Sequence, residues 1–137
     1  MYRFLDRNLS DLDEGARFTV DAIRKWVTAV ADRQCPADAV TPAFLDRRLI
    51  GALAPFHRAL TLLVVHGRMQ IGFARSCCPV VAEGEALLLA LLDRSNDRGP
   101  ACEAAVTAPH VEGLQQAVME LEAAMAVAGL APGSAGR

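Results

Sequence analysis

The sequence predicts an all-α fold, a compact bundle of four to five helices with one short extended segment around residues 69–76. Apolar residues make up 53% of the chain and aromatic residues only 5%. The core must therefore consist of aliphatic side chains and close-packed alanine, a composition that favours helices packed together. Apolar residues also recur at alternating spacings of three and four, which is the period of an amphipathic helix.

A first helix is predicted after Ser10 or Asp11, either of which can serve as its N-cap. It carries one apolar stripe and stops before Cys35-Pro36, because the residue before a proline avoids the helical region. The stripe contains Ala16, Val20, Ile23, Val27 and Val30.

A second helix is predicted from Thr41-Pro42 to Gly67, since proline is favoured in the first helical position and glycine just beyond the end. Pro55 lies inside this pattern, so we expect a kink or a split into two helices near Ala54. The apolar stripe contains Leu45, Leu49, Ala52, Phe56, Leu60 and Leu63.

Between residues 69 and 76 the helical period fails. Met69, Ile71 and Phe73 alternate with small or polar residues, which indicates an extended segment. A lone strand cannot form a sheet, so we expect either a ribbon over the bundle or an edge that pairs with a second copy.

The remaining elements are helices. A Leu-rich helix is predicted over about residues 81–94, a short helical turn over 101–106, and a last helix from Pro109. We expect one helical domain over residues 1–130, which is an ordinary size for a single core, and a disordered tail over residues 131–137.

The charge of the chain argues against nucleic acid as a partner. The formal net charge is −2, whereas nucleic-acid binding requires a basic face that neutralises many phosphates. Residues 44–79 are basic and the residues from 80 onward are acidic. These two parts can attract one another, or the basic part can be offered to an acidic partner.

The N-terminal residues have no apolar core and no cleavage site of a secretory signal, so we expect a cytoplasmic location. The most apolar stretch, residues 49–66, contains Pro55, His57 and Arg58. Charged side chains of this kind are costly within a bilayer, so no transmembrane segment is predicted.

The candidate site is the segment Arg75-Ser76-Cys77-Cys78-Pro79. Its two thiols precede a helix and lie near an arginine, and both a helix N-terminus and a cation stabilise a thiolate. Glu83 and Glu85 at the opening of that helix oppose this effect. The cysteine pair therefore has two open interpretations, a structural one and a redox or ligand-binding one.

Metal and haem are weakly indicated, and a chain without a cofactor is the expectation. The candidate metal ligands lack the C-x-x-C spacing of zinc sites. Cys35 and Cys102 are interpreted as small buried residues, and the Cys35-Pro36 and Cys78-Pro79 pairs are the only haem-like motifs. The candidate ligands are Cys35, Cys77, Cys78, Cys102 and His66.

Catalysis is not indicated, although the enzyme question stays open. A nucleophilic thiol would need His57 or His66 beside Cys77 or Cys78, and the sequence does not place them together. Phosphate-binding glycine loops, di-metal helix motifs and serine-hydrolase motifs are missing from the sequence.

The stretch from His66 to Leu92, with Cys77-Cys78-Pro79 before a Leu-rich helix, resembles small uncharacterised alphaproteobacterial proteins with the same Cys-Cys-Pro signature. The resemblance covers about a quarter of the chain, which is the length of one helix and the loop that precedes it. It implies a role for the cysteine segment but no particular activity.

The apolar excess favours a non-catalytic helical interaction or regulatory module, acting as a homodimer or with a protein partner, because surplus apolar surface marks interfaces. The alternative is a redox, metal or haem sensor that uses Cys77 and Cys78.

Overall fold

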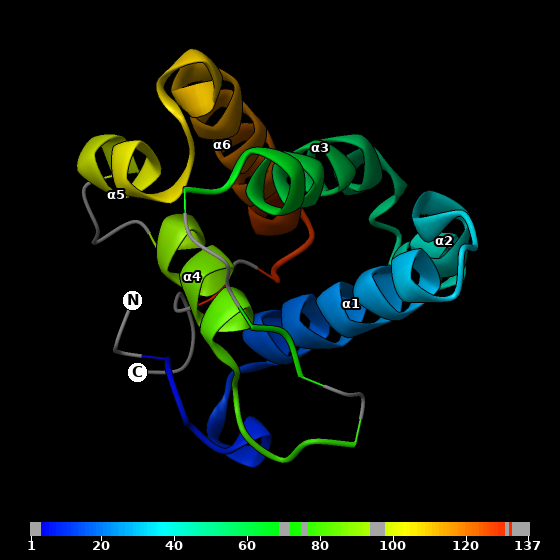
Figure 1. Cartoon of the computed structure of the whole chain (residues 1–137). Coiled ribbons are helices and arrows are strands. Elements are labelled where there is room, and N and C mark those ends of the chain that lie inside the picture. The colour runs from blue at the N-terminus through cyan, green and yellow to red at the C-terminus, as the bar shows by residue number, and fades with distance from the viewer. Residues whose placement is uncertain (1–3, 69–71, 75–76, 94–97, 131, 133–137) are drawn as a thin grey trace.

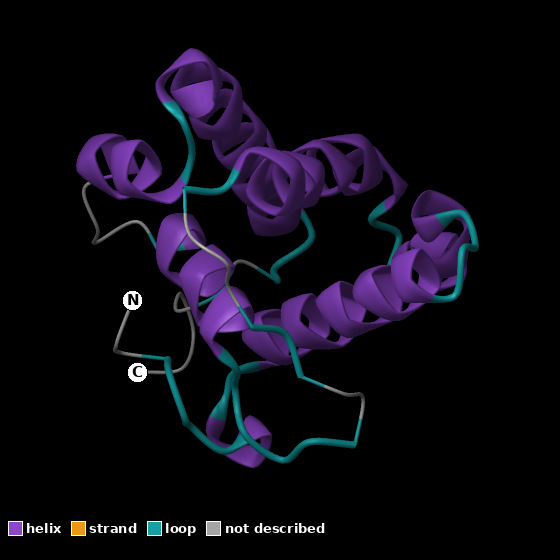
Figure 2. Cartoon of the chain, in the orientation of Figure 1, coloured by secondary structure: helices purple, strands orange, loops and turns teal. Residues whose placement is uncertain are grey.

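The structure is a computed structural model that describes residues 4–68, 72–74, 77–93, 98–130 and 132. Within these residues there are six α-helices and no strand (Figures 1 and 2). The all-α prediction is confirmed. The elements are η1 (Leu9–Asp11), α1 (Glu14–Ala31), α2 (Pro36–Asp46), α3 (Ile50–His66), α4 (Glu83–Leu92), α5 (Arg98–Ala105), η2 (Ala108–His110) and α6 (Val111–Val127), where η marks a single 3₁₀ turn.

The predicted number of four to five helices is wrong for two reasons. The predicted second helix, for which we expected a kink or a split, is split into α2 and α3. It begins at Pro36 rather than at Thr41-Pro42, because Pro36 opens the helix and Pro42 lies inside α2. The predicted short turn over residues 101–106 is the complete helix α5. The Leu-rich helix and the last helix lie within two residues of the expected positions, as α4 and α6.

The break between α2 and α3 lies at residues 47–49 rather than near Ala54. Arg48 takes a left-handed backbone conformation with φ of 56°. Its N–H donates to the Leu45 carbonyl at 3.0 Å, and the Leu49 N–H donates to the Phe44 carbonyl at 2.7 Å. This pair of bonds is the Schellman motif that closes a helix, here built without glycine.

Pro55 lies inside α3 without ending it. A proline removes the helical donor for the carbonyl four residues earlier, which belongs to Gly51. Because Gly51 is exposed, water can replace that donor.

The N-cap of α1 is Asp13, not Ser10 or Asp11. The Asp13 carboxylate accepts a hydrogen bond from the Ala16 N–H at 2.8 Å. Ser10 and Asp11 belong instead to the 3₁₀ turn η1 that precedes the cap.

The most extensive helix pairing is α3 against α6, and α4 lies in the middle, in contact with α1, α5 and α6 (Figure 1). The imidazole rings of His66 and His110 stack at 3.5 Å between centroids, so the end of α3 meets the start of α6. One large apolar cluster joins all the helices, including Trp26, Phe56 and Leu88.

A second, smaller apolar cluster lies between the N-terminal segment, α1 and α4. Its members are Phe4, Leu12, Ala16, Val20, Val81, Ala86, Leu89 and Ala90. Through Val81, this satellite cluster holds the chain between the candidate site and α4.

Part of the sequence-based prediction lies outside the described residues. Of the predicted extended segment 69–76, only residues 72–74 are described, and they have no regular secondary structure. Of the predicted tail 131–137, only Pro132 is described. Over the described ranges, none of the helices has the length and apolar character needed to span a membrane.

Candidate functional site

The candidate segment is attached to a buried ion pair between α1 and α4. Arg24 has a side-chain exposure of 2% and Glu85 of 0%. Nε of Arg24 donates to Oε2 of Glu85 at 3.0 Å, and Nη2 donates to Oε1 at 2.9 Å. This bidentate geometry is the strongest form of an arginine–carboxylate contact. The hydrogen bond to Glu85 raises the pKa of Arg24 against the opposing effect of burial.

Both side chains also make hydrogen bonds to the backbone around the cysteines. Arg24 donates to the carbonyls of Cys78 at 2.7 Å and Val80 at 2.8 Å. Glu85 accepts hydrogen bonds from the N–H groups of Ala74 at 3.1 Å and Ala82 at 2.9 Å. One buried pair therefore fixes residues on both sides of Cys77-Cys78-Pro79.

The N-terminal segment holds the opposite edge of residues 79–81. The Leu9 N–H donates to the Pro79 carbonyl at 2.8 Å, and the Val81 N–H donates to the Arg7 carbonyl at 2.9 Å. The Asp6 N–H donates to the Val81 carbonyl at 3.0 Å. Residues 78–81 thus lie between Arg24 on one side and the N-terminal segment on the other.

The two thiols of the segment have different environments. Cys77 is exposed, whereas Cys78 is half-buried and its S–H donates to the Val80 carbonyl at 3.5 Å. Arg75, which the sequence suggested as the neighbouring cation, lies outside the described residues. Among the described residues the cation next to Cys78 is Arg24.

Sequence reasoning missed Arg24 because a charged residue in an amphipathic helix is normally assigned to solvent. The available signal was indirect. Arg24 follows the buried Ile23, and Glu85 lies in the most apolar helix of the chain. Two opposite charges in apolar surroundings suggest a buried pair, since an unpaired charge is rarely buried.

The other candidate ligands do not join this site. All four cysteines are free. Cys35 is exposed, so its interpretation as a buried residue is wrong, because it occupies the N-cap position of α2 at the surface. Cys102 is buried as predicted, and burial raises the pKa of its thiol to about 11.

The histidines are engaged with other rings. Nδ1 of His57 accepts a hydrogen bond from Nε1 of Trp26 at 3.0 Å. His66 stacks on His110 with an angle of 13° between the ring planes. No group of three or more His, Cys, Asp or Glu in the described parts of the chain is placed to hold a metal ion.

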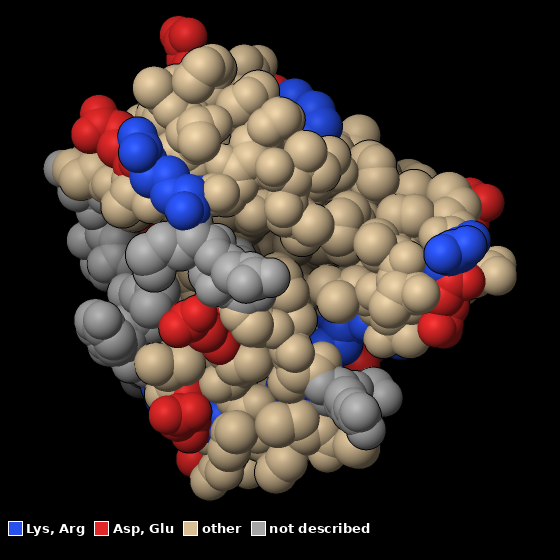
Figure 3. Space-filling view, in the orientation of Figure 1, with Lys and Arg blue, Asp and Glu red and all other residues tan. Residues whose placement is uncertain are grey.

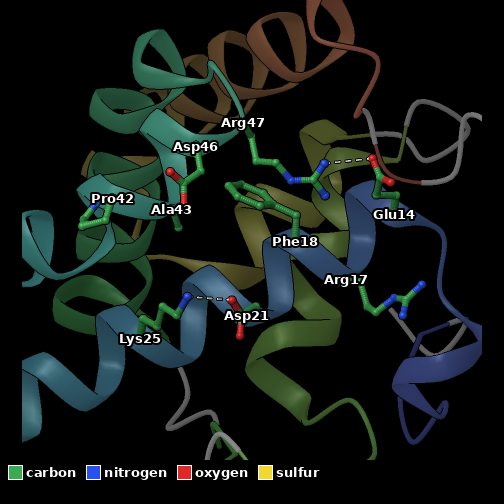
Figure 4. A pocket seen from close by; sticks show the side chains of 9 residues that line it. All are labelled: Glu14, Arg17, Phe18, Asp21, Lys25, Pro42, Ala43, Asp46 and Arg47. Atoms are coloured by element: carbon green, nitrogen blue, oxygen red, sulfur yellow. Dashed lines mark hydrogen bonds and ion pairs between the residues drawn. The ribbon is translucent and has the colours of Figure 1, made fainter.

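A surface pocket of about 520 Å³ lies between α1 and α2 (Figure 4). Phe18 lies near its centre with the Arg47 guanidinium above the ring at 5.9 Å, and Arg47 also pairs with Glu14 at 3.0 Å. Lys25 pairs with Asp21 at 3.0 Å. Most of the charges in this pocket therefore satisfy each other.

A second surface hollow, of about 490 Å³, follows the outer face of α6. Its lining is Glu112, Gln115, Gln116, Met119, Glu120 and Ala123. The positions three and four residues apart place these side chains on one face of the helix, opposite the face that enters the core.

Comparison with known proteins adds no assignment: no family model, no curated protein and no solved structure matches this chain.

Proposed function

We propose that this protein is a non-catalytic helical interaction module that acts as a homodimer. The observation that supports it is the apolar surface on the outer faces of α2, α3 and α6. Met119 and Val127 of α6 are 57% and 92% exposed. Further exposed apolar side chains on α2 and α3 are Leu45, Ile50, Val64 and Val65.

The exposure of these side chains does not come from an incompletely packed core. The inner faces of the same helices are already fully buried, for example at Phe44, Leu63 and Leu121. Single exposed apolar residues are common on monomers, but here they lie on helices that pack next to one another. On the face shown in Figure 3, the surface over α3 is largely free of charged side chains. An uncharged surface that includes exposed apolar side chains, such as Val64 and Val65, is a feature that interfaces share.

The oligomeric state tests this proposal directly. We expect light scattering after size-exclusion chromatography to give twice the chain mass at micromolar concentration. Met119→Ser should shift the equilibrium toward the monomer, because it removes an apolar contact at the interface. Val30→Ser changes an exposed apolar residue of α1 and serves as the matched control. A wild-type chain that is monomeric at every concentration contradicts the proposal.

A thiol-dependent sensor is the second candidate, and the exposed Cys77 next to the buried ion pair favours it. A sensor requires at least one accessible reactive thiol or a bound metal. The test is elemental analysis with free-thiol titration of reduced and unreduced protein, repeated with Cys77→Ala and Cys78→Ala. Metal or an oxidisable thiol that disappears in these variants supports a sensor. Four unreactive thiols without metal contradict it.

A further inference from the structure

The corner between α2 and α3 combines exposed apolar side chains with three exposed charged residues, Asp46, Arg47 and Arg48. Leu45 and Ile50 are 56% and 49% exposed, on either side of Arg48. The intervening Leu49 is buried and anchors the corner to the core. Arg47 is paired with Glu14, whereas Arg48 has no ion-pair partner among the described residues.

The hollow on α6 has the complementary chemistry. Met119 and Ala123 supply apolar surface, and Glu112 and Glu120 supply carboxylates. The sequence of α6 contains no lysine or arginine. Glu120 is paired with Arg58 at 2.5 Å. Glu112 has no ion-pair partner among the described residues.

The two features therefore match in apolar character, and Arg48 and Glu112 supply one pair of opposite charges. We propose that, in the homodimer, the α2–α3 corner of each copy docks in the α6 hollow of the other, with Arg48 facing the partner's Glu112. This inference rests on the homodimer proposed above and specifies its interface. A second copy is the fitting occupant because one chain carries both halves of the contact, and a two-fold axis repeats the contact twice.

The charge pair gives the proposal a sharp test. Arg48→Glu and Glu112→Arg each place two like-charged contacts across the interface, and like charges across an interface are strongly unfavourable. We expect each variant to dimerise at least about tenfold more weakly than wild type. A 1:1 mixture of the two variants should form a heterodimer of near wild-type affinity. In that heterodimer the carboxylate introduced at position 48 of one copy faces the guanidinium introduced at position 112 of the other, and the second contact is native.

Arg33→Glu is the matched control, since Arg33 is also exposed and has the same left-handed conformation, with φ of 58°, at the end of α1. It should leave dimerisation unchanged. Sedimentation equilibrium of each variant and of the mixture measures the association constants.

The outcomes separate this inference from the proposed function. If wild type is monomeric, both fail. If both variants dimerise like wild type, or if the mixture does not recover the lost affinity, the homodimer stands and this interface is wrong.

Discussion

Arg24 and Glu85 are the two residues on which the candidate site depends most. A buried ion pair gains little over an apolar pair, because desolvation offsets the attraction. The loss of one partner is different, since it leaves a buried charge without compensation. This pair also carries four backbone hydrogen bonds of residues 74–82, so its loss should reach the cysteine segment.

Glu85→Gln should lower the free energy of unfolding by about 3–5 kcal/mol, because Arg24 stays buried while its carboxylate partner is lost. Urea unfolding followed by circular dichroism measures the change. Glu83→Gln, at the start of the same helix, should have an effect below about 0.5 kcal/mol. A Glu85→Gln variant as stable as Glu83→Gln would show that the pair contributes little.

The raised pKa of the buried Cys102 thiol makes the stability of the fold depend on pH. Its pKa rises from 9.0 to about 11 in the folded chain, so the unfolded chain loses the thiol proton first as the pH increases. Ionisation of Cys102 therefore leaves the free energy of unfolding unchanged below pH 9 and lowers it as the pH rises from 9 toward 11. The slope is about 1.4 kcal/mol per pH unit.

The measurement is the difference in unfolding free energy between wild type and Cys102→Ala at pH values from about 8 to about 11, a range that spans both pKa values of the thiol. We expect wild type to lose stability relative to the variant across this range. A constant difference would mean that the thiol ionises equally in both states. Thiol labelling at the lower end of this range should correspondingly modify Cys35 and Cys77 well before Cys102.

At the scale of elements, periodicity predicts the presence of the helices well, and the errors concern where they begin and end. The starts of α1 and α2 differ from the predicted caps, and the break between α2 and α3 lies where a helix ends without its usual glycine. The ends of α1 and α2 are closed by left-handed arginines, Arg33 and Arg48. Among the described helices, α6 alone is followed by a left-handed glycine, Gly129, with φ of 75°. The predicted Gly67 does follow α3, but with a φ of −62°. Because nothing in the sequence marks an arginine as a left-handed residue, the sequence pattern instead places the break near Ala54, next to Pro55.

At the candidate site, too, local sequence patterns predict the nearby elements but not the contacts between distant ones. The sequence singled out Cys77 and Cys78 as neighbours of a helix start, and α4 does begin shortly after them. Arg24 is 54 residues away from Cys78 in the chain, so no local pattern reports their contact. Long-range pairing of this kind follows from packing rather than from periodicity.

The start of α4 is the tightest packing point next to the site. A Cβ atom on Gly84 would lie 2.9 Å from the Gly72 carbonyl and 2.5 Å from the Phe73 ring. The Gly84 N–H also donates to the Gly72 carbonyl at 2.7 Å. Gly84 therefore allows α4 and the preceding segment to approach closely.

Gly84→Ala should destabilise the protein by about 1–3 kcal/mol, because the clash outweighs the better helix propensity of alanine. Gly113→Ala in α6 is the matched comparison. Its Cβ would meet only Leu62, at 3.7 Å, so it should stabilise by up to about 1 kcal/mol. Thermal unfolding of both variants measures these effects. Changes of the same sign in the two unfolding temperatures would contradict this packing argument.

At the scale of the whole molecule, the fold has two apolar clusters of unequal size. The large one joins all six described helices. The satellite cluster depends on Phe4 and Leu12 of the N-terminal segment, which also supplies the hydrogen bonds to residues 79–81. The cysteine segment therefore adjoins the smaller of the two clusters, and we expect local opening there to require less free energy than opening of the large cluster.

Deletion of residues 1–12 should destabilise the chain around residues 78–81 locally and leave the large apolar cluster folded. It removes Phe4 and Leu12 and the donors and acceptors that pair with residues 79–81. Hydrogen exchange should then accelerate at Val81 and at the start of α4, while the amides of α3 and α6 stay protected. Cys78 should react faster with thiol reagents, whereas Cys102 should stay protected. Uniform loss of protection would instead mean that the two clusters form one cooperative unit, in which the N-terminal segment is required for the whole fold.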